Sequence, residues 1–171
     1  MNDYPAKPAV PPLVTGLKGA MRFLTGGVSV ITAGIGEDVT GLTVTTAHSL
    51  SMDPPVMIIS VNRNSSGYAA ISKHRHFCVN ILSAEQRDVA ERFSGFGGIK
   101  GRERYQGSTW SALATGALAL DGALASVDCE VTDVINRYSH GLFLGEVRQV
   151  RLADASAAQL VYRNGAYGIH P

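Results

Sequence analysis

The chain contains the stretch ALASVDCEVTDVI at residues 123–135, and HGLFLGEVRQVRL follows at residues 140–152. Both stretches have the length and the apolar content of long β-strands, and a short turn joins them. So short a connection favours an antiparallel hairpin, because parallel strands need a crossover of roughly a dozen residues or more. A long antiparallel hairpin is therefore expected to set the architecture of the chain.

Further strands and helices are predicted on both sides of this hairpin. Strands are expected at residues 28–34, 39–46, 56–62, 76–82 and 159–168, and helices at 16–24, 65–73 and 83–94. The glycine-rich residues 94–109 show no periodicity and predict a mobile loop. Strands dominate, and most connections between them are too short for β-α-β crossovers. The predicted fold class is mainly β, an antiparallel barrel with a few short helices.

Length and composition indicate one domain preceded by a short arm. A chain of 171 residues is long enough for a single domain with a sizeable core. Residues 1–14 are rich in proline and lack periodicity, so we expect a flexible arm over residues 1–15 and one domain over residues 16–171. Charged residues are 17% of the chain, below the roughly 25% of average domains. That low fraction favours a surface partly buried against a second subunit.

Charge and hydropathy argue against two classes of partner. The net charge of +1 argues against nucleic-acid binding by bulk charge. No apolar run reaches the roughly 18 residues that a membrane span needs. The N-terminal sequence MNDYPAKPAVPPL lacks the layout of a signal peptide. We therefore expect a cytoplasmic protein that binds neither nucleic acid nor membrane.

Several common site motifs are missing from the sequence. It holds no G-x-G-x-x-G opening a helix, no G-x-x-x-x-G-K-[ST], no H-E-x-x-H and no G-x-S-x-G. The five histidines and two cysteines show no metal-ligand spacing, so no metal is expected. Cys78 and Cys129 lie in apolar, strand-like runs and are predicted to be buried free thiols.

Two segments carry residues suited to a ligand. The first, GLTVTTAHSLSMDPP at residues 41–55, crowds hydroxyl side chains and backbone donors onto an extended chain. Such donors suit the polar edge of a planar heterocycle. The alternative is a threonine-rich strand that leads to a surface turn.

The second segment, SVNRNSSGYAAI at residues 60–71, leaves a strand and enters a helix through Asn, Arg and Ser. Backbone N–H groups at a helix N-terminus, with hydroxyls and a guanidinium nearby, suit a phosphate. The alternative is ordinary N-capping of the helix by Ser65.

The order and spacing of these segments resemble the flavin reductase-like family over about residues 19–168. The resemblance rests on a series of stretches along the chain: FLTGGVSVITA, GLT followed by SLSMDPP, NRNSS, FCVNILS, ERFSG, ALASVDCEV, SHGLFLGEV and YRNGAYG. It implies a split β-barrel, a Greek-key antiparallel barrel of the FMN-binding type, and a homodimer. It also implies hydride transfer from NADH or NADPH to FMN or FAD, and delivery of reduced flavin to a partner monooxygenase.

The resemblance also implies roles for particular residues. His140 matches the family histidine close to the nicotinamide and is the expected catalytic residue. Residues 45–48 would lie along the isoalloxazine ring, residues 60–66 near the ribityl phosphate, and two residues at a helix end beside the flavin. The flavin-binding set implied is Thr45, Thr46, Ala47, His48, Ser60, Val61, Asn62, Arg63, Ser65, Ser66, Phe93 and Ser94. The sequence departs from the family at Tyr138–Ser139, where many relatives carry Gly with Asp or Thr.

Two other functions remain open at this point. Hydride transfer needs alignment of two rings and exclusion of water rather than a strong acid or base, which agrees with a site of hydroxyl and backbone groups. A flavin-binding protein without turnover would use the same groups. So would an oxidase of the related pyridoxamine-phosphate type on a similar barrel.

Overall fold

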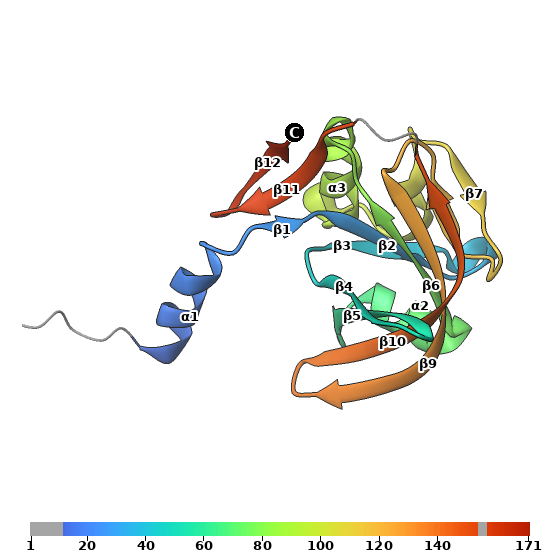
Figure 1. The fold of residues 1–171 in the computed structure, drawn as a ribbon, viewed down its shortest axis with the longest axis horizontal. Coiled ribbons are helices and arrows are strands. Elements are labelled where there is room, and N and C mark those ends of the chain that lie inside the picture. Colours follow the sequence, from blue (N-terminus) through green and yellow to red (C-terminus); the bar gives the residue numbers. More distant parts are fainter. Residues whose placement is uncertain (1–11, 154–156) are drawn as a thin grey trace, which may run out of the picture.

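The computed structural model describes residues 12–153 and 157–171 (Figure 1). Most of the predicted N-terminal arm, residues 1–11, lies outside the described residues. Helix α1 spans Leu13–Met21, so residues 13–15 of that predicted arm are helical. The helix begins directly after Pro12. The proline ring fixes φ near the helical value, and the missing N–H of proline costs nothing there because that group has no acceptor within the helix.

A curled, seven-stranded antiparallel sheet forms the body of the molecule. Its hydrogen-bonded order is β3-β2-β6-β9-β10-β5-β4. The predicted long hairpin is confirmed as β9 and β10, which project beyond the rest of the sheet (Figure 1). The strands span Ser29–Ala33 (β2), Thr40–Val44 (β3), Ala47–Met52 (β4), Pro55–Asn62 (β5), His76–Ile81 (β6), Ala125–Arg137 (β9) and His140–Leu152 (β10).

The sheet is split rather than closed. Strands β3 and β4 stand at opposite ends of the hydrogen-bonded order, yet only Thr45 and Thr46 separate them in the chain. Three peptide units span at most roughly 11 Å. The two edges of the sheet must therefore lie close together, as Figure 1 shows. This arrangement confirms the split barrel expected from the sequence.

Two smaller sheets complete the fold. Strand β1 (Gly26–Gly27) pairs with β11 (Gln159–Arg163), which pairs with β12 (Ala166–His170). The sequence predicted one strand at residues 159–168, which is wrong. The chain reverses at Asn164 and Gly165, both with positive φ, as in the Asn-Gly turns of tight hairpins. The third sheet holds β7 (Trp110–Ala112) and β8 (Leu118–Leu120).

Two hydrophobic clusters lie on opposite faces of β2 and β3. Ile31 faces the first cluster, together with helix α2 (Ser66–His74). Val30 faces the second, together with helix α3 (Arg87–Phe93). This alternation follows from the two-residue period of a strand. Strand β3 is thus held between two helices.

The prediction of a loop at residues 94–109 is wrong in part. It contains two 3-10 helices, η3 (Phe96–Gly98) and η4 (Gly101–Tyr105). Tyr105 is buried, and its hydroxyl donates to the Thr40 carbonyl at 2.6 Å. That contact fastens the segment to β3.

The two cysteines are buried free thiols, as predicted. Burial raises the pKa of Cys129 to about 12, which keeps that thiol protonated and unreactive. In the part of the chain that the structure describes, no helix is long and apolar enough to cross a membrane.

Candidate functional site

The link between the two sheet edges opens onto a cavity of about 640 Å³, here called the link cavity. All four residues from Thr45 to His48 line it, opposite Gly26, Gly27 and Tyr162. A Cβ atom on Gly26 would stand 2.8 Å from the Cβ of Thr45, so the glycine permits this close approach. The structure therefore brings the hydroxyl-rich segment of the sequence to one concave surface.

Strand β5 continues past the end of β4 on one side of this link. The pairing of β5 with β4 extends only to Ile59, which lies opposite Ala47. The pairing of β5 with β10 extends further, to Asn62, which lies opposite His140. The Thr46 hydroxyl donates to the Ser60 carbonyl at 3.2 Å. The link and the end of β5 are thus joined directly.

Register places several of the predicted residues on one face of the sheet. Paired residues share a face, and alternate residues along a strand share it too. His48, Ser60, Asn62 and His140 therefore lie on the outer face. Ala47 and Val61 lie on the inner face. Val61 is fully buried there, so its side chain supports the strand.

His140 begins β10 next to the turn of the long hairpin. Its imidazole is exposed, and its Nδ1 atom lies 2.9 Å from the Ser139 hydroxyl. The turn is attached to the end of β5, because the Arg63 N–H donates to the Ser139 carbonyl at 2.9 Å. The Arg63 guanidinium donates to the Tyr138 carbonyl at 3.3 Å. These contacts hold the turn beside His140 against the end of β5.

The segment after β5 forms a capped helix start. Ser65 is the N-cap of α2, and its hydroxyl accepts from the Tyr68 N–H and donates to the Asn62 carbonyl. This is the capping alternative considered for the sequence, and it occupies the Ser65 hydroxyl. The N–H groups of Ser66 and Gly67 are the first of the helix and have no intrahelical acceptor. The Ser66 hydroxyl lies 3.1 Å from that of Thr40 on β3.

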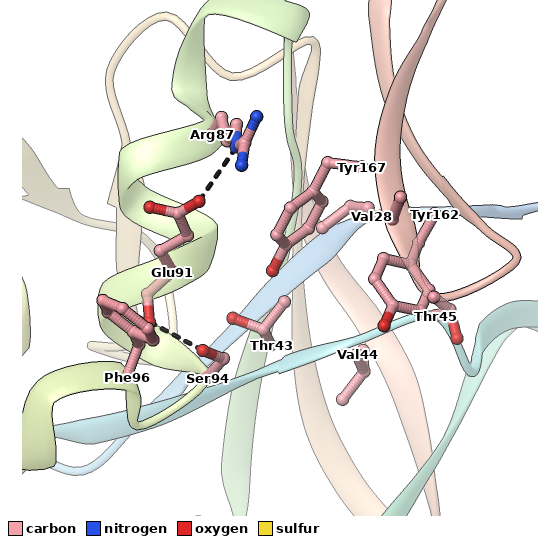
Figure 2. A pocket seen from close by; sticks show the side chains of 12 residues that line it. Val28, Thr43, Val44, Thr45, Arg87, Glu91, Ser94, Phe96, Tyr162 and Tyr167 are labelled. Atoms are coloured by element: carbon pink, nitrogen blue, oxygen red, sulfur yellow. Dashed lines mark hydrogen bonds and ion pairs between the residues drawn. The ribbon is translucent and has the colours of Figure 1, made fainter.

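A second cavity, of about 610 Å³, lies between α3, β3 and β12 and is here called the α3 cavity (Figure 2). Thr45 and Tyr162 line both cavities, so the two are neighbours. Ser94 lies at its edge and donates to the Glu91 carbonyl at 2.7 Å. The sequence interpretation missed its other polar and aromatic residues, which are Arg87, Glu91, Phe96, Tyr162 and Tyr167.

Comparison with known proteins identifies the family. The sequence profile described as "Flavin reductase like domain" matches residues 21–170. The chain belongs to the flavin reductase-like family. The FMN reductase (NADH) RutF 2 of Rhizobium rhizogenes is 32% identical over 163 residues, which cover 95% of this chain and 92% of that protein.

Solved structures of other members have the same fold. A putative flavin reductase from Haemophilus somnus superposes with a TM-score of 0.85 at 30% identity, covering 91% of this chain and 98% of that one. BorF, the flavin reductase component of a bacterial two-component tryptophan halogenase, gives a TM-score of 0.84 at 26% identity, covering 92% and 98%. The split barrel of this flavin reductase-like chain is therefore the fold of the family.

Phe93, a residue of the predicted flavin-binding set, is buried in the core of this flavin reductase-like chain. The Phe93 side chain is 1% exposed. Its ring packs edge-on against Tyr105, with the ring centroids 5.0 Å apart, and lies tilted beside Trp110, with the centroids 5.4 Å apart. Gly41 lies against the Phe93 ring, because a Cβ at that position would be 2.7 Å from it. The Phe93 ring therefore supports β3 from within the core, and its place beside the flavin stays a prediction.

The chemistry of the remaining groups fits a flavin. The link supplies hydroxyl and backbone groups for a planar polar ring, and the start of α2 supplies unpaired N–H donors for a phosphate. Among residues 12–153 and 157–171, no cluster of three His, Cys, Asp or Glu side chains is placed to hold a metal ion.

Proposed function

We propose that this protein transfers a hydride from NADH or NADPH to FMN or FAD, and that it supplies the reduced flavin to a partner monooxygenase. The observation that carries the proposal is the split of the sheet, where four consecutive residues, Thr45 to His48, line one cavity. Membership of the flavin reductase-like family supports the same activity. When bound, the flavin supplies the hydride acceptor.

The isoalloxazine ring would lie along the link, with residues 45–48 binding its polar edge. Hydrogen-bond donors held there in advance stabilise the negative charge that a reduced ring carries. The Thr46 hydroxyl is held by the Ser60 carbonyl, which orients this part of the link. The link cavity is concave, so a bound ring would also displace water from the surface where the hydride is transferred.

The ribityl phosphate would lie at the start of α2. The N–H groups of Ser66 and Gly67 belong to the first turn of α2, where the helix dipole favours an anion. The Ser66 hydroxyl adds a donor, and the Arg63 guanidinium lies on the adjoining turn. Ser65 contributes by capping the helix, since its own hydroxyl is already engaged.

His140 would orient the nicotinamide. It stands opposite Asn62 at the end of β5, on the same face as Ser60 and His48. Its ring is exposed, and the Ser139 hydroxyl restrains it. A restrained ring at this edge of the site positions a second planar ring over the first, which is the alignment that hydride transfer needs.

The activity is tested by following NADH absorbance with the purified protein, with and without added FMN or FAD. We expect rapid, flavin-dependent NADH oxidation. Flavin that stays bound through gel filtration while NADH is oxidised slowly would indicate a binding protein instead. Oxygen consumption with an amine substrate and no response to NADH would indicate a pyridoxamine-phosphate-type oxidase.

Two assemblies form part of the proposal. BorF is the flavin reductase component of a two-component tryptophan halogenase, and this supports a flavin-dependent oxygenase as the partner here. A cytoplasmic location agrees with a consumer of NADH. Transfer of reduced flavin is tested by adding a flavin-dependent oxygenase and measuring its hydroxylated product.

A homodimer is the second assembly. Helix α1 buries none of its residues and stands away from the sheet (Figure 1), with Leu13, Leu17 and Met21 more than half exposed. Exposed apolar side chains in such number mark an interaction surface, and a second copy would cover it. Light scattering should give twice the 18.1 kDa of one chain. A mass of one chain at micromolar concentration would contradict the dimer.

A further inference from the structure

His76, the first residue of β6, is buried although it is polar. It is 4% exposed, and its Nε2 atom is the only buried side-chain nitrogen or oxygen of residues 12–153 and 157–171 that lacks a hydrogen-bond partner. A buried polar atom without a partner costs free energy, and a buried charge without a partner costs far more. The fold therefore tolerates the neutral ring of His76 much better than the protonated ring.

Charged neighbours of the His76 ring lie on α2, β9 and β10. His74, the last residue of α2, stacks on the ring with centroids 5.9 Å apart, and its own Nε2 atom lies 3.2 Å from an Asp38 carboxylate oxygen. Glu130 on β9 is paired in register with His76, but its carboxylate accepts from Arg148 of β10 at 2.9 Å. Both of these carboxylates are thus already engaged with other side chains.

A third carboxylate near the ring belongs to Asp128, which is fully buried on β9. Both of its oxygens accept from Thr115, one from the N–H at 2.8 Å and the other from the hydroxyl at 2.6 Å. Burial is the largest influence on the ring and lowers the pKa of His76, while the carbonyls of Gly34 and Thr115 and the Asp128 charge partly oppose it. The ring is therefore neutral at neutral pH.

Thr115 lies in the turn between β7 and β8, residues 113–117, here called the Thr115 turn. The two strands have three residues each and form a sheet of their own. A two-stranded sheet is marginally stable by itself. Besides the bonds to Asp128, the Ala114 N–H donates to the Gln149 side chain of β10 at 3.0 Å. Since a few side-chain bonds attach the turn to the large sheet, it is suited to local opening.

A cavity of about 500 Å³ adjoins this turn. Its lining includes Ala114 and Thr115 from the turn, His76 from β6, and His74 and Arg75 from the end of α2. Movement of the turn away from β6 would widen the cavity beside the imidazole. Water could then solvate the atom that lacks a partner in the closed structure.

We propose that the Thr115 turn is an acid-sensitive switch, in which protonation of His76 releases Thr115 from Asp128 and opens the turn to water. In the open form the ring is solvated, so its pKa is near the ordinary value of about 6.5. Protonation therefore favours the open form as the pH falls below about 6.5, until the pH reaches the lower pKa of the closed form. The closed form predominates at neutral pH. The switch does not depend on the proposed reductase activity.

Hydrogen exchange of the backbone amides measures this opening directly. The Leu113 N–H donates to the Ala117 carbonyl at 3.0 Å across the turn, and the Thr115 N–H donates to Asp128. After correction for the intrinsic exchange rate at each pH, the protection of both amides should fall by up to about tenfold between about pH 7.5 and about pH 5.5. Equal protection at the two pH values would overturn the proposal.

Two matched variants identify the titrating group. His76→Gln should remove the dependence of the protection on pH. His74→Gln, which changes the neighbouring ring, should retain the dependence of the parent protein. If His74→Gln abolished the dependence, or if His76→Gln retained it, the titrating group would not be His76 and the proposal would fail.

Urea separates local opening from global unfolding. Local opening exposes little surface, so protection in the Thr115 turn should change little between 0 and about 1 M urea, whereas protection in β6 should fall steeply. Thr115→Val should lower protection of the Leu113 amide about tenfold at both pH values, because it removes a bond to a charged group. Equal urea dependence in the turn and β6, or full protection of Leu113 in Thr115→Val, would contradict the switch.

Discussion

The Thr46 hydroxyl donates to the Ser60 main-chain carbonyl at 3.2 Å and so ties the link between the two sheet edges to the end of β5. Thr46 belongs to the segment proposed for the isoalloxazine, and Ser60 to the segment that leads to the proposed phosphate site. The bond therefore fixes the spacing between two parts of one ligand. The bond is exposed, so it contributes little to the free energy of unfolding. Its loss should mainly weaken the binding of the flavin.

Thr46→Val removes this bond at nearly constant volume. A neutral hydrogen bond contributes about 1 kcal/mol, so the Kd for FMN should rise about fivefold while the Tm changes little. Thr132→Val is the matched control, because the exposed Thr132 hydroxyl also donates to a strand carbonyl, that of Leu144, at 3.2 Å. Fluorescence titration of FMN gives both Kd values. Equal losses of affinity in the two variants would show that the effect is not local to the link.

Ser66→Asp places a carboxylate at the proposed phosphate site. Repulsion between the two anions should raise the Kd for FMN at least about tenfold, or ~1.4 kcal/mol. An acidic residue in the first turn of α2 does not harm the helix, so the Tm of the apoprotein should hold. Riboflavin, which lacks the phosphate, serves as the control ligand. Its Kd should stay near that of the parent protein, and unchanged FMN affinity would place the phosphate elsewhere.

His140→Ala should slow reduction of bound flavin by NADH or raise the KM for NADH. A lost positioning contact costs about tenfold, or ~1.4 kcal/mol. The Kd for flavin should change little, because residues 45–48 and 60–66 bind it. His170→Ala, near the C-terminus, is the control and should behave as the parent. Stopped-flow rates equal to the parent at every NADH concentration would remove His140 from the site.

His76 should make folding sensitive to acid. Burial lowers the pKa of His76 below its usual value, and its Nε2 atom is buried without a partner among the described residues. The unfolded chain therefore takes up a proton near pH 6.5 that the folded chain resists. The contribution of His76 to the free energy of unfolding is therefore complete above about pH 6.5. It decreases as the pH drops below that value, and it stops decreasing below the pKa that His76 has in the folded protein.

The comparison is between His76→Gln and His170→Gln. Urea unfolding at about pH 7.5 and about pH 5.5 should show a smaller loss of stability on acidification for His76→Gln than for the parent. His170→Gln should retain the dependence of the parent. A His76→Gln variant that loses as much stability as the parent would mean that other groups cause the acid sensitivity.

The long hairpin and the central strands were predictable because their patterns are local. Runs such as HFCVNIL, which forms β6, are mostly apolar and lie inside the sheet, where both faces are covered. Strand β4 was missed, since Ala47–Met52 is an edge strand with a mostly exposed, polar sequence. Its pairing with β5 comes from the fold rather than from strand propensity.

Some parts of the candidate site could likewise be predicted from the sequence, and others could not. The hydroxyl-rich residues 45–48 and the helix start at Ser65 could be found from the sequence, because each is one continuous segment. The α3 cavity could not, because Glu91 and Tyr167 meet only when β12 packs beside α3. The burial of the Phe93 ring could not be predicted either, since a family pattern gives the position of a residue and not the burial of its side chain.

The position of FMN in a crystal of the complex tests the account most directly. We predict the polar edge of the isoalloxazine within hydrogen-bonding distance of residues 45–48, with the phosphate at the N–H groups of Ser66 and Gly67. Density for the ring away from the link, with no contact to residues 45–48, would contradict the account.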